Sequence, residues 1–303
     1  MSRYSTFVKA AAEEGCECSE NELMSRYTTF AIGGPADVFV EVKSVEKLVQ
    51  LVKIARETLT PMLVVGNGSN LLVSGDGIEG AVLHLNELSE IKLIDESTIE
   101  CGSGVKLSKL CRFAADNCLT GLEFAWGIPG TVGGAAYMNA GAYGSCMSEV
   151  VLSCDHVSSD GCVGSNSKDK LEFEYRTSCY KNSGDIITLV KLQLAQGEQP
   201  KIRQKMDDLM LKRKSKQPLE YPSAGSVFKR PVGYFAGSLI ELCGLKGYSI
   251  GGAEVSVKHA GFIINKGGAT CDDVLKLINY IQAQVLKEFD VELETEIAVV
   301  GRF

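Results

Sequence analysis

The sequence predicts an α+β protein that folds in three regions. Its 303 residues are 45% hydrophobic, so the chain can bury more than one core and is too long for a single ordinary domain. Segments with helical spacing and segments with strand-like alternation both occur, and there is no internal repeat, low-complexity tract or heptad array. We expect regions at 1–86, 87–198 and 199–303, with a final strand that can pack back on the first two.

The first region starts with a strand and a capped helix. Residues 36–42 (ADVFVEV) predict the strand, and Ser44 caps a helix whose apolar residues fall at helical spacing: Val45, Leu48, Val49 and Val52. A strand at 62–65 then runs into Gly-Asn-Gly-Ser-Asn at 66–70, followed by the apolar residues 71–73. This pattern predicts two strands joined by a loop of small residues.

The second region is expected to consist mainly of short strands and turns. One helix over 106–116 has a single apolar face, made of Leu107, Leu110, Cys111 and Ala114. A glycine-rich run at 127–144 follows, and a strand at 187–194 closes the region. Residues 196–200 (QGEQP) are predicted to link it to a helix with an inward face of Ile202, Met206, Leu209 and Met210.

The third region contains the strongest helical pattern in the chain, over 272–288. Thr270 and Asp273 form a capping box, and the apolar stripe comprises Val274, Leu277, Ile278, Ile281 and Val285. A final strand is expected over 291–300. Its glutamate-bearing face becomes apolar at Ala298, which would place Glu296 at the dry border of that face.

Composition excludes several functional classes. A net charge of -7 and a pI near 5.2 disfavour binding to the phosphates of a nucleic acid. No apolar run reaches the length of a membrane span, and the N-terminus is too charged for a secretory signal, so we expect a cytoplasmic protein without membrane insertion. The eleven cysteines are scattered and odd in number, which favours reduced thiols, and no cysteine–histidine cluster indicates a metal site.

Two glycine-rich segments are the strongest candidates for ligand binding. Residues 127–141 contain five glycines among small and apolar residues, and 66–70 contain two more. Glycines let backbone N–H groups approach a pyrophosphate without interference from a Cβ atom. Neither segment fits the dinucleotide fingerprint or the Walker motif, because Leu71 stands where a third glycine belongs and no Walker lysine follows. Two plain turns between strands remain the alternative for either segment alone.

Four polar residues stand out beside these segments. Each has a simpler interpretation: Arg176 as a surface arginine, Ser226 as a turn residue, Glu296 as part of a wet strand face, and His259 as a core or edge histidine. Single-residue reasoning does not choose between these interpretations and a catalytic one.

Long motifs occur along nearly the whole chain. They are TTFAIGGP (28–35), GNGSN (66–70), GIPGTVGG (127–134), YRTS (175–178), QPLEYPSAGSVFK (217–229), GLKG (244–247), KHAGF (258–262) and ETEI (294–297). With these motifs in this order, the chain resembles the UDP-N-acetylenolpyruvoylglucosamine reductase family. The chain is similar to the shorter branch of this family, which lacks an extra substrate loop and its tyrosine.

The resemblance implies a fold and a set of site residues. The fold is a two-lobed PCMH-type FAD-binding module followed by a smaller α+β substrate-binding domain. By position, the catalytic residues are Arg176, Ser226 and Glu296. FAD is expected to bind Gly66, Asn67, Gly68, Ser69, Asn70, Gly127, Ile128, Pro129, Gly130, Gly133, Gly134, Asn139 and Gly141. The expected substrate-binding residues are Lys216, Lys229, Lys246 and His259.

The implied reaction is the NADPH-dependent reduction of UDP-N-acetylglucosamine enolpyruvate to UDP-N-acetylmuramate, a step in peptidoglycan precursor synthesis. Hydride passes from flavin N5 to C3 of the enol ether, and a proton is added at C2. Arg176 suits the substrate carboxylate and its enolate form, because a guanidinium stays charged and can bind two oxygens. Ser226 is expected to protonate C2 with help from Lys216 or Lys229, while Glu296 orients the substrate or supplies the proton through Ser226.

Two alternatives remain at this stage. Another PCMH-type FAD oxidoreductase, acting on a sugar or hydroxy acid, would share the glycine segments but not the combination of Arg176, Ser226 and Glu296. A flavin-binding protein without turnover is the other alternative, because a fold alone does not guarantee activity.

Overall fold

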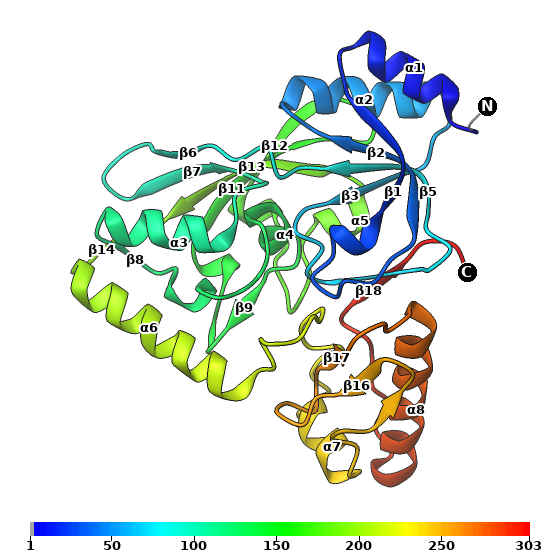
Figure 1. Cartoon of the computed structure of the whole chain (residues 1–303). Helices are drawn as coiled ribbons and strands as arrows, with labels where there is room; N and C mark the ends of the chain where they lie inside the picture. Colours follow the sequence, from blue (N-terminus) through cyan, green and yellow to red (C-terminus); the bar gives the residue numbers. More distant parts are fainter. Residues whose placement is uncertain (1–2) are drawn as a thin grey trace. The chain divides into compact units, whose positions relative to one another are not determined.

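The computed structural model describes residues 3–303, which form two compact units. Unit 1 comprises the residues up to Glu20, Val38–Asn67 and Gly80–Lys212. Unit 2 comprises Asn21–Asp37, Gly68–Glu79 and Arg213–Phe303. Each unit is therefore assembled from segments that are far apart in the sequence, as the colours of Figure 1 show.

A sheet that lies mainly in unit 1 has the strand order β1-β2-β5-β3, in which β3 and β5 are parallel. Its strands are β1 (Cys18–Leu23), β2 (Pro35–Glu41), β5 (Ile78–His84) and β3 (Met62–Val65). The helices α1 (Ser5–Glu13) and α2 (Val45–Glu57) share a core with this sheet, built from residues such as Phe7, Leu51 and Leu83. Ser44 caps α2 by accepting a hydrogen bond from Lys47 N–H at 3.3 Å, as expected for an N-cap serine.

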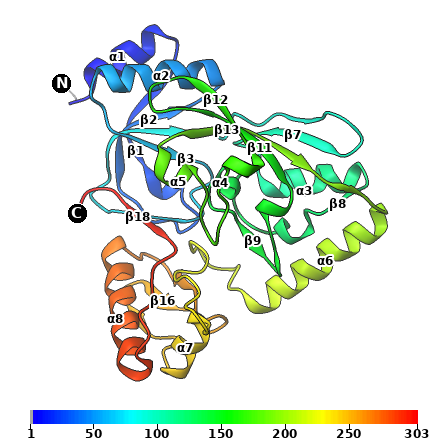
Figure 2. The same ribbon diagram turned by 180° about the vertical axis from the view of Figure 1, so that it is seen from behind.

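A second, antiparallel sheet in unit 1 has the order β12-β11-β13-β7-β6. Its strands are β12 (Val163–Ser167), β11 (Val151–Val157), β13 (Ile186–Gln193), β7 (Thr98–Gly102) and β6 (Ile91–Leu93). Two helices, α3 (Leu107–Asp116) and α4 (Val132–Tyr137), contribute to its core (Figure 2). The short pairs β8–β14 (Leu119–Thr120, Ala195–Gln196) and β9–β10 (Gly141–Ala142, Ser145–Cys146), and the one-turn helix α5 (Tyr180–Ser183), complete the region.

Unit 2 packs helices against a small antiparallel sheet of order β15-β16-β17. The sheet consists of β15 (Ser249–Ile250), β16 (Ala253–Val255) and β17 (Ile263–Asn265), and the helices are α7 (Ala236–Leu242) and α8 (Cys271–Phe289). The core also includes Phe30, Ile32 and Leu72 from early in the chain. The final strand β18 (Ala298–Val300) pairs in parallel with β4 (Leu71–Val73).

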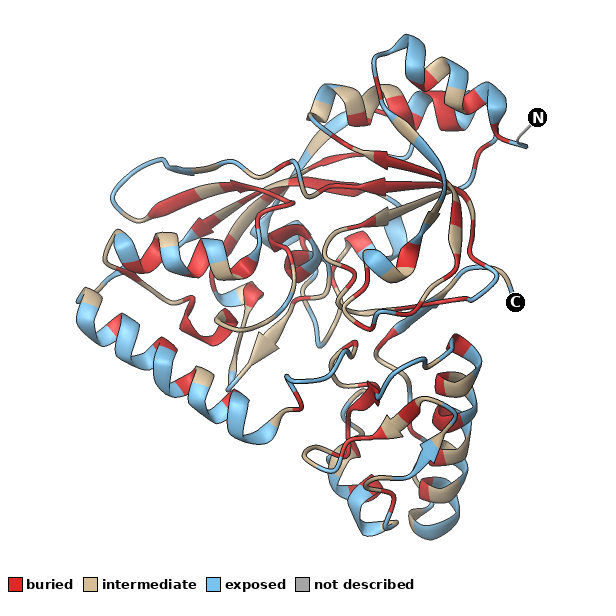
Figure 3. Ribbon diagram, viewed as in Figure 1, coloured by how far each residue is buried: buried red, intermediate tan, exposed pale blue. Residues whose placement is uncertain are grey.

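Most expected elements are confirmed, because their signals are local. The strands at 62–65 and 71–73 have the expected bounds, and the predicted apolar stripe of α8 is entirely buried. Thr270 and Asp273 form the expected capping box. The helix after the linker is α6 (Gln199–Lys216), whose Ile202, Met206 and Leu209 are buried and whose remaining surface is largely exposed (Figure 3).

The expected final strand at 291–300 is wrong in length. Only 298–300 form a strand, since the stretch before it bonds to a different segment: Lys229 N–H donates to Glu294 C=O and Glu296 N–H to Val227 C=O. Two partners in succession prevent one long ladder. Ala298 is exposed, so the face that carries Glu296 does not become dry there.

The expected three-region division, 1–86, 87–198 and 199–303, stays a prediction.

All eleven cysteines are free thiols. None of the helices within residues 3–303 combines the length and the apolar character that a membrane span requires.

Candidate active site

The first glycine segment, 66–70, connects β3 to β4 and is held by close backbone contacts. In unit 1, a Cβ atom on Gly66 would lie 2.4 Å from Thr131 Oγ1, and Asn67 Nδ2 donates to Pro129 C=O at 2.6 Å. This end of the segment therefore packs directly on the second glycine segment.

Unit 2 contains the other end of this segment. Gly68 has φ +57°, and a Cβ atom there would lie 2.0 Å from the carbonyl oxygen of Tyr27, so only glycine fits. The Gly68 carbonyl accepts a hydrogen bond from Thr29 N–H at 3.2 Å, and Thr29 also binds Ser223 through its hydroxyl. The motif at 28–35 thus joins the first glycine segment to the segment 223–226, which contains Ser223 and Ser226.

The second glycine segment contains the short helix α4. Thr131 caps it by accepting from Gly134 N–H at 3.4 Å, and Gly133 packs so closely that a Cβ atom would lie 2.6 Å from Ser103 Cβ. Gly134 differs from Gly133: it is exposed, and the nearest atom to an added Cβ is Thr131 Oγ1 at 3.4 Å. Packing within the protein explains Gly133 but leaves Gly134 unexplained, which fits a ligand that approaches the backbone at Gly134.

Arg176 lies on a tight turn that is anchored at several points. Glu174 and Thr177 pair across the turn, and Arg176 has φ +57°, a backbone conformation uncommon for a residue with a side chain. Its Nη1 donates to Gly141 C=O at 3.4 Å, and its guanidinium lies over the Tyr175 ring at 5.3 Å. These contacts fix the position of a permanently charged group.

Asn139 supports this turn from the second glycine segment. Its Nδ2 donates to Glu174 C=O at 2.9 Å, and its Oδ1 accepts from Ser148 N–H at 2.9 Å. Ser178 adds a hydrogen bond to Tyr137 C=O at 2.8 Å. Because both ends of the Asn139 amide are used inside the protein, this residue connects the expected cofactor segment to the arginine turn.

Ser226 sits half-buried between two buried anchors, Ala224 and Val227. Gly225 before it has φ +79°, and Val227 N–H donates to Gly261 C=O at 2.9 Å. Across residues 3–303, the Ser226 hydroxyl has no hydrogen-bond partner, although the backbone on either side is fixed. The hydroxyl is therefore available to a ligand at a defined position.

Glu296 is joined to the serine segment by its backbone. Its N–H donates to Val227 C=O at 2.7 Å, while its carbonyl accepts from Asn70 Nδ2 at 3.1 Å. The Asn70 carbonyl accepts from Ala298 N–H at 2.9 Å. Unit 2 thus brings together three segments that are more than 60 residues apart in sequence and that contain Asn70, Ser226 and Glu296.

The four expected substrate-binding residues all lie in unit 2. Lys229 pairs with Glu294 at 2.9 Å, and Lys246 pairs with Glu241 at 2.5 Å, whereas Lys216 is exposed at the end of α6. The ion pair with Glu294 partly neutralises Lys229, so this lysine is a weaker aid to Ser226 than its position in the sequence suggests.

His259 is held in a half-buried pocket between two glycines. A Cβ atom on Gly237 or Gly261 would lie 3.4 Å or 3.1 Å from its Cε1, and Gly261 N–H donates to its Nδ1 at 3.2 Å. Burial, with a smaller contribution from nearby Lys246, lowers the pKa of His259 below its usual value. The shift favours the neutral ring, which can serve as a hydrogen-bonding group.

Sequence reasoning gave no role to the residues that align these segments. Thr29 joins Gly68 to Ser223, and Asn265 binds the Phe30 carbonyl at 3.2 Å. The motif at 28–35 marks Thr29 and Phe30 as part of a distinctive segment, but their partners Ser223 and Asn265 lie about 200 residues away in the sequence. The helix α4 was also missed, although Thr131 before Gly134 has the pattern of an N-cap.

Comparison with known proteins shows the family of the chain. Residues 36–164 match the family model of an FAD binding domain, and residues 217–300 match that of the C-terminal domain of UDP-N-acetylenolpyruvoylglucosamine reductase. The reductase of Clostridium perfringens is 45% identical over 100% of both chains, and that of Clostridium tetani is 47% identical over 99% of this chain and 98% of its own.

Solved structures give the same result at the level of the fold. The reductase from Thermus caldophilus superposes with a TM-score of 0.80 at 36% identity, covering 94% of this chain and 98% of its own. A glucose dehydrogenase, Phl p 4.0202, shares the fold over 64% of this chain and 44% of its own, with a TM-score of 0.51 and 16% identity.

The glycine segments, the fold and the FAD-domain match define an FAD-containing oxidoreductase with a two-part architecture. The two-lobed FAD-binding module followed by a smaller α+β domain is thereby confirmed. The full-length identities establish more: the chain belongs to the UDP-N-acetylenolpyruvoylglucosamine reductase family.

Proposed function

We propose that the chain catalyses the NADPH-dependent reduction of UDP-N-acetylglucosamine enolpyruvate to UDP-N-acetylmuramate, in the cytoplasm, as a step of peptidoglycan precursor synthesis. FAD, when bound, would supply the hydride-transfer chemistry that links NADPH to C3 of the enol ether. The observation that carries the proposal is the junction of the Ser226 and Glu296 segments, made by the 2.7 Å hydrogen bond between Glu296 N–H and Val227 C=O.

The residues proposed to hold FAD are those of the two glycine segments. Gly66, Gly68, Gly130 and Gly134, with Asn67, Ser69 and Asn70, would present backbone and side-chain donors to its pyrophosphate. The exposed backbone of Gly134 supports this assignment most directly. Ile128 and Pro129, with Gly127, Gly133, Asn139 and Gly141, would shape the same segment around the cofactor.

Arg176 is proposed to bind the substrate carboxylate. As C3 gains hydride, negative charge develops on the carboxylate and C2, and a fixed guanidinium stabilises that charge better than mobile water does. The left-handed turn and the bond to Gly141 hold the guanidinium in place before the substrate arrives. The arginine then loses little orientational freedom during the reaction.

Ser226 is proposed to donate the proton to C2. Its hydroxyl has no hydrogen-bond partner among residues 3–303 that would compete with the substrate, and its backbone is fixed on both sides. The Glu296 segment, bonded to the residue after Ser226, is proposed to orient the substrate or to return a proton to the serine. Lys216, Lys229, Lys246 and His259 supply cationic and hydrogen-bonding groups for the sugar nucleotide in the same unit.

Replacement of Arg176 tests the proposal through substrate use. The wild-type enzyme is expected to oxidise NADPH only when the enolpyruvyl nucleotide is present. We expect Arg176→Met to lower kcat/KM for that nucleotide by about a hundredfold or more, as for loss of a charged contact made in the transition state. Arg176→Lys should recover only a small part, because a lysine cannot bind two oxygens with the same geometry.

The matched control is Arg56→Met, which removes an exposed arginine from α2 of the same unit. It should leave kcat/KM for the enolpyruvyl nucleotide within about twofold of the wild type, as expected for a surface site. Equal losses in the Arg176 and Arg56 variants, or NADPH oxidation that glucose supports as well as the nucleotide does, would refute the proposal.

A further inference from the structure

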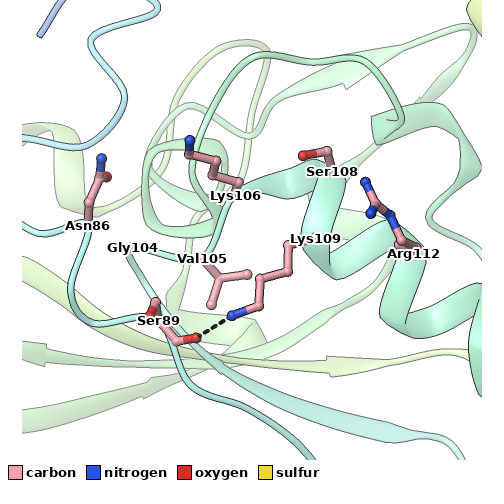
Figure 4. Close-up of a pocket in the computed structure, with 8 residues that line it drawn as sticks. All are labelled: Asn86, Ser89, Gly104, Val105, Lys106, Ser108, Lys109 and Arg112. Carbon is pink, nitrogen blue, oxygen red and sulfur yellow. Dashed lines mark hydrogen bonds between the residues drawn. The ribbon is translucent and has the colours of Figure 1, made fainter.

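A basic cavity lies in unit 1 at the start of α3, and neither the catalytic residues nor the expected cofactor residues line it (Figure 4). Its volume is about 270 Å³. The polar groups that line it come from the loop after β5 and from the first turns of α3: Asn86, Ser89, Lys106, Ser108, Lys109 and Arg112.

The cavity is positively charged, whereas the whole chain has a negative net charge. Three cations line it and no carboxylate does, although the net charge of the protein is -7. Many exposed lysines and arginines of the chain pair with a carboxylate, as Lys43 does with Glu17 in the same unit. Across residues 3–303, neither lysine nor the arginine of the cavity forms an ion pair. Three unneutralised cations around one cavity create a local site for a multiply charged anion.

The cations are arranged by helix geometry. Lys106, Lys109 and Arg112 are spaced three residues apart and therefore fall on one side of α3. Lys109 reaches across the cavity and donates to the Ser89 carbonyl at 3.1 Å, which fixes its ammonium at the wall (Figure 4). The N-terminus of this ten-residue helix adds positive potential at the same place.

We propose that this cavity binds the phosphate or pyrophosphate group of a small ligand other than FAD. Arginine and lysine with nearby hydroxyl and amide donors are the residue types that recognise phosphate. A volume of about 270 Å³ lies just below the range of sites that enclose a whole drug-sized ligand, so the rest of the ligand extends outside. The ligand is either the NADPH of the proposed reaction, through its phosphates, or a separate phosphorylated metabolite.

The cavity wall is also continuous with the second glycine segment. Leu107 N–H donates to Gly130 C=O at 3.0 Å, and Val132 N–H donates to Val105 C=O at 2.8 Å. Neither bond uses Gly134 N–H, which donates to Thr131 Oγ1. A phosphate in the cavity would therefore lie beside the second glycine segment, none of whose residues lines the cavity.

The test is calorimetric titration of inorganic pyrophosphate into the FAD-loaded, full-length protein. We expect measurable binding to the wild type and a loss of affinity of about tenfold or more in Arg112→Gln, with a larger loss in Lys109→Gln/Arg112→Gln, as for removal of hydrogen bonds between charged groups. Lys9→Gln, an exposed lysine on α1 of the same unit, is the control and should bind as the wild type does.

A second measurement identifies the source of the phosphate. If the ratio of kcat/KM for NADPH to that for NADH falls in the cavity variants, the phosphate belongs to the reductant; this arm alone rests on the proposed use of NADPH. An unchanged ratio with lost pyrophosphate binding assigns the cavity to a separate metabolite. Equal pyrophosphate affinity in the wild type, the cavity variants and Lys9→Gln would overturn the site. Loss of FAD from the cavity variants would overturn it as well, because the phosphate would then be that of the cofactor.

Discussion

Replacing Ser226 by alanine is expected to leave flavin reduction by NADPH near the wild-type rate and to slow reoxidation by the enolpyruvyl nucleotide by about a hundredfold to ten-thousandfold. The first half-reaction needs no proton at C2, whereas the second cannot be completed without one, and loss of a general acid has effects of this size. The fixed backbone of residues 224–228 should keep the substitution local. Stopped-flow absorbance of each half-reaction separates the two rates.

The conservative variant Ser226→Cys provides the matched control. A thiol can still donate a proton, so it should retain more of the second half-reaction than the alanine variant does. If both half-reactions of Ser226→Ala slow equally, or if reoxidation is normal, Ser226 is a structural residue of its loop. The proton would then have to come from Glu296 or from a water molecule.

Replacing Gly134 by valine is expected to yield a folded but colourless protein. Gly134 is exposed on α4, and the nearest atom to an added Cβ is 3.4 Å away, so the protein itself can accept a side chain there. A pyrophosphate bound at the backbone of Gly134 would clash with a valine side chain there, because both would occupy the same space. The flavin content should fall by about tenfold or more, as measured by the flavin absorbance at about 450 nm.

Two other glycines separate flavin binding from folding. In Gly133→Ala the added Cβ would lie 2.6 Å from Ser103 Cβ, so this variant should lose thermal stability whether or not flavin is added. Gly75 has no atom within 4 Å of an added Cβ and lies beyond the far end of β4, so Gly75→Val should keep both its fold and its flavin. A yellow Gly134→Val protein with full flavin content would show that the cofactor binds elsewhere.

The sequence predicted well those parts of the fold that local signals determine. Helix α8 follows from one apolar stripe and one capping box, both within 20 residues, and the strand at 62–65 is bounded by small residues at its end. Packing of these elements could not change their type, because periodicity and capping agree.

Long-range pairing determined what the sequence did not predict. The stretch 291–300 has the alternation of a strand, but it bonds first to 227–229 and then to β4, so it forms only a short ladder. The basic cavity has a similar origin: Ser89 and Lys109 are 20 residues apart and meet only because the loop after β5 lies beside the start of α3, where Gly104 N–H donates to Leu88 C=O. Neither partner carries a sequence signal that names the other.

For the candidate site too, the sequence predicted which residues take part but not their long-range contacts. Residue types and motif resemblance were sufficient to select Arg176, Ser226 and Glu296, but not to show how each is held. Arg176 depends on a left-handed turn anchored by Asn139 and Gly141, and Ser226 depends on Gly225 and on the neighbouring Gly261. Each of these supports has a backbone carbonyl or N–H group as at least one partner, and such groups occur along the whole chain, so residue identity alone does not reveal the pairing.

An anaerobic titration of the purified protein tests the central claim most directly. The account predicts a yellow protein whose absorbance near about 450 nm is bleached by NADPH under nitrogen, stays bleached with glucose or a hydroxy acid, and returns when the enolpyruvyl nucleotide is added, with UDP-N-acetylmuramate as the product. Return of the colour with a sugar or hydroxy acid as the second substrate, or no bleaching by NADPH at all, would contradict it.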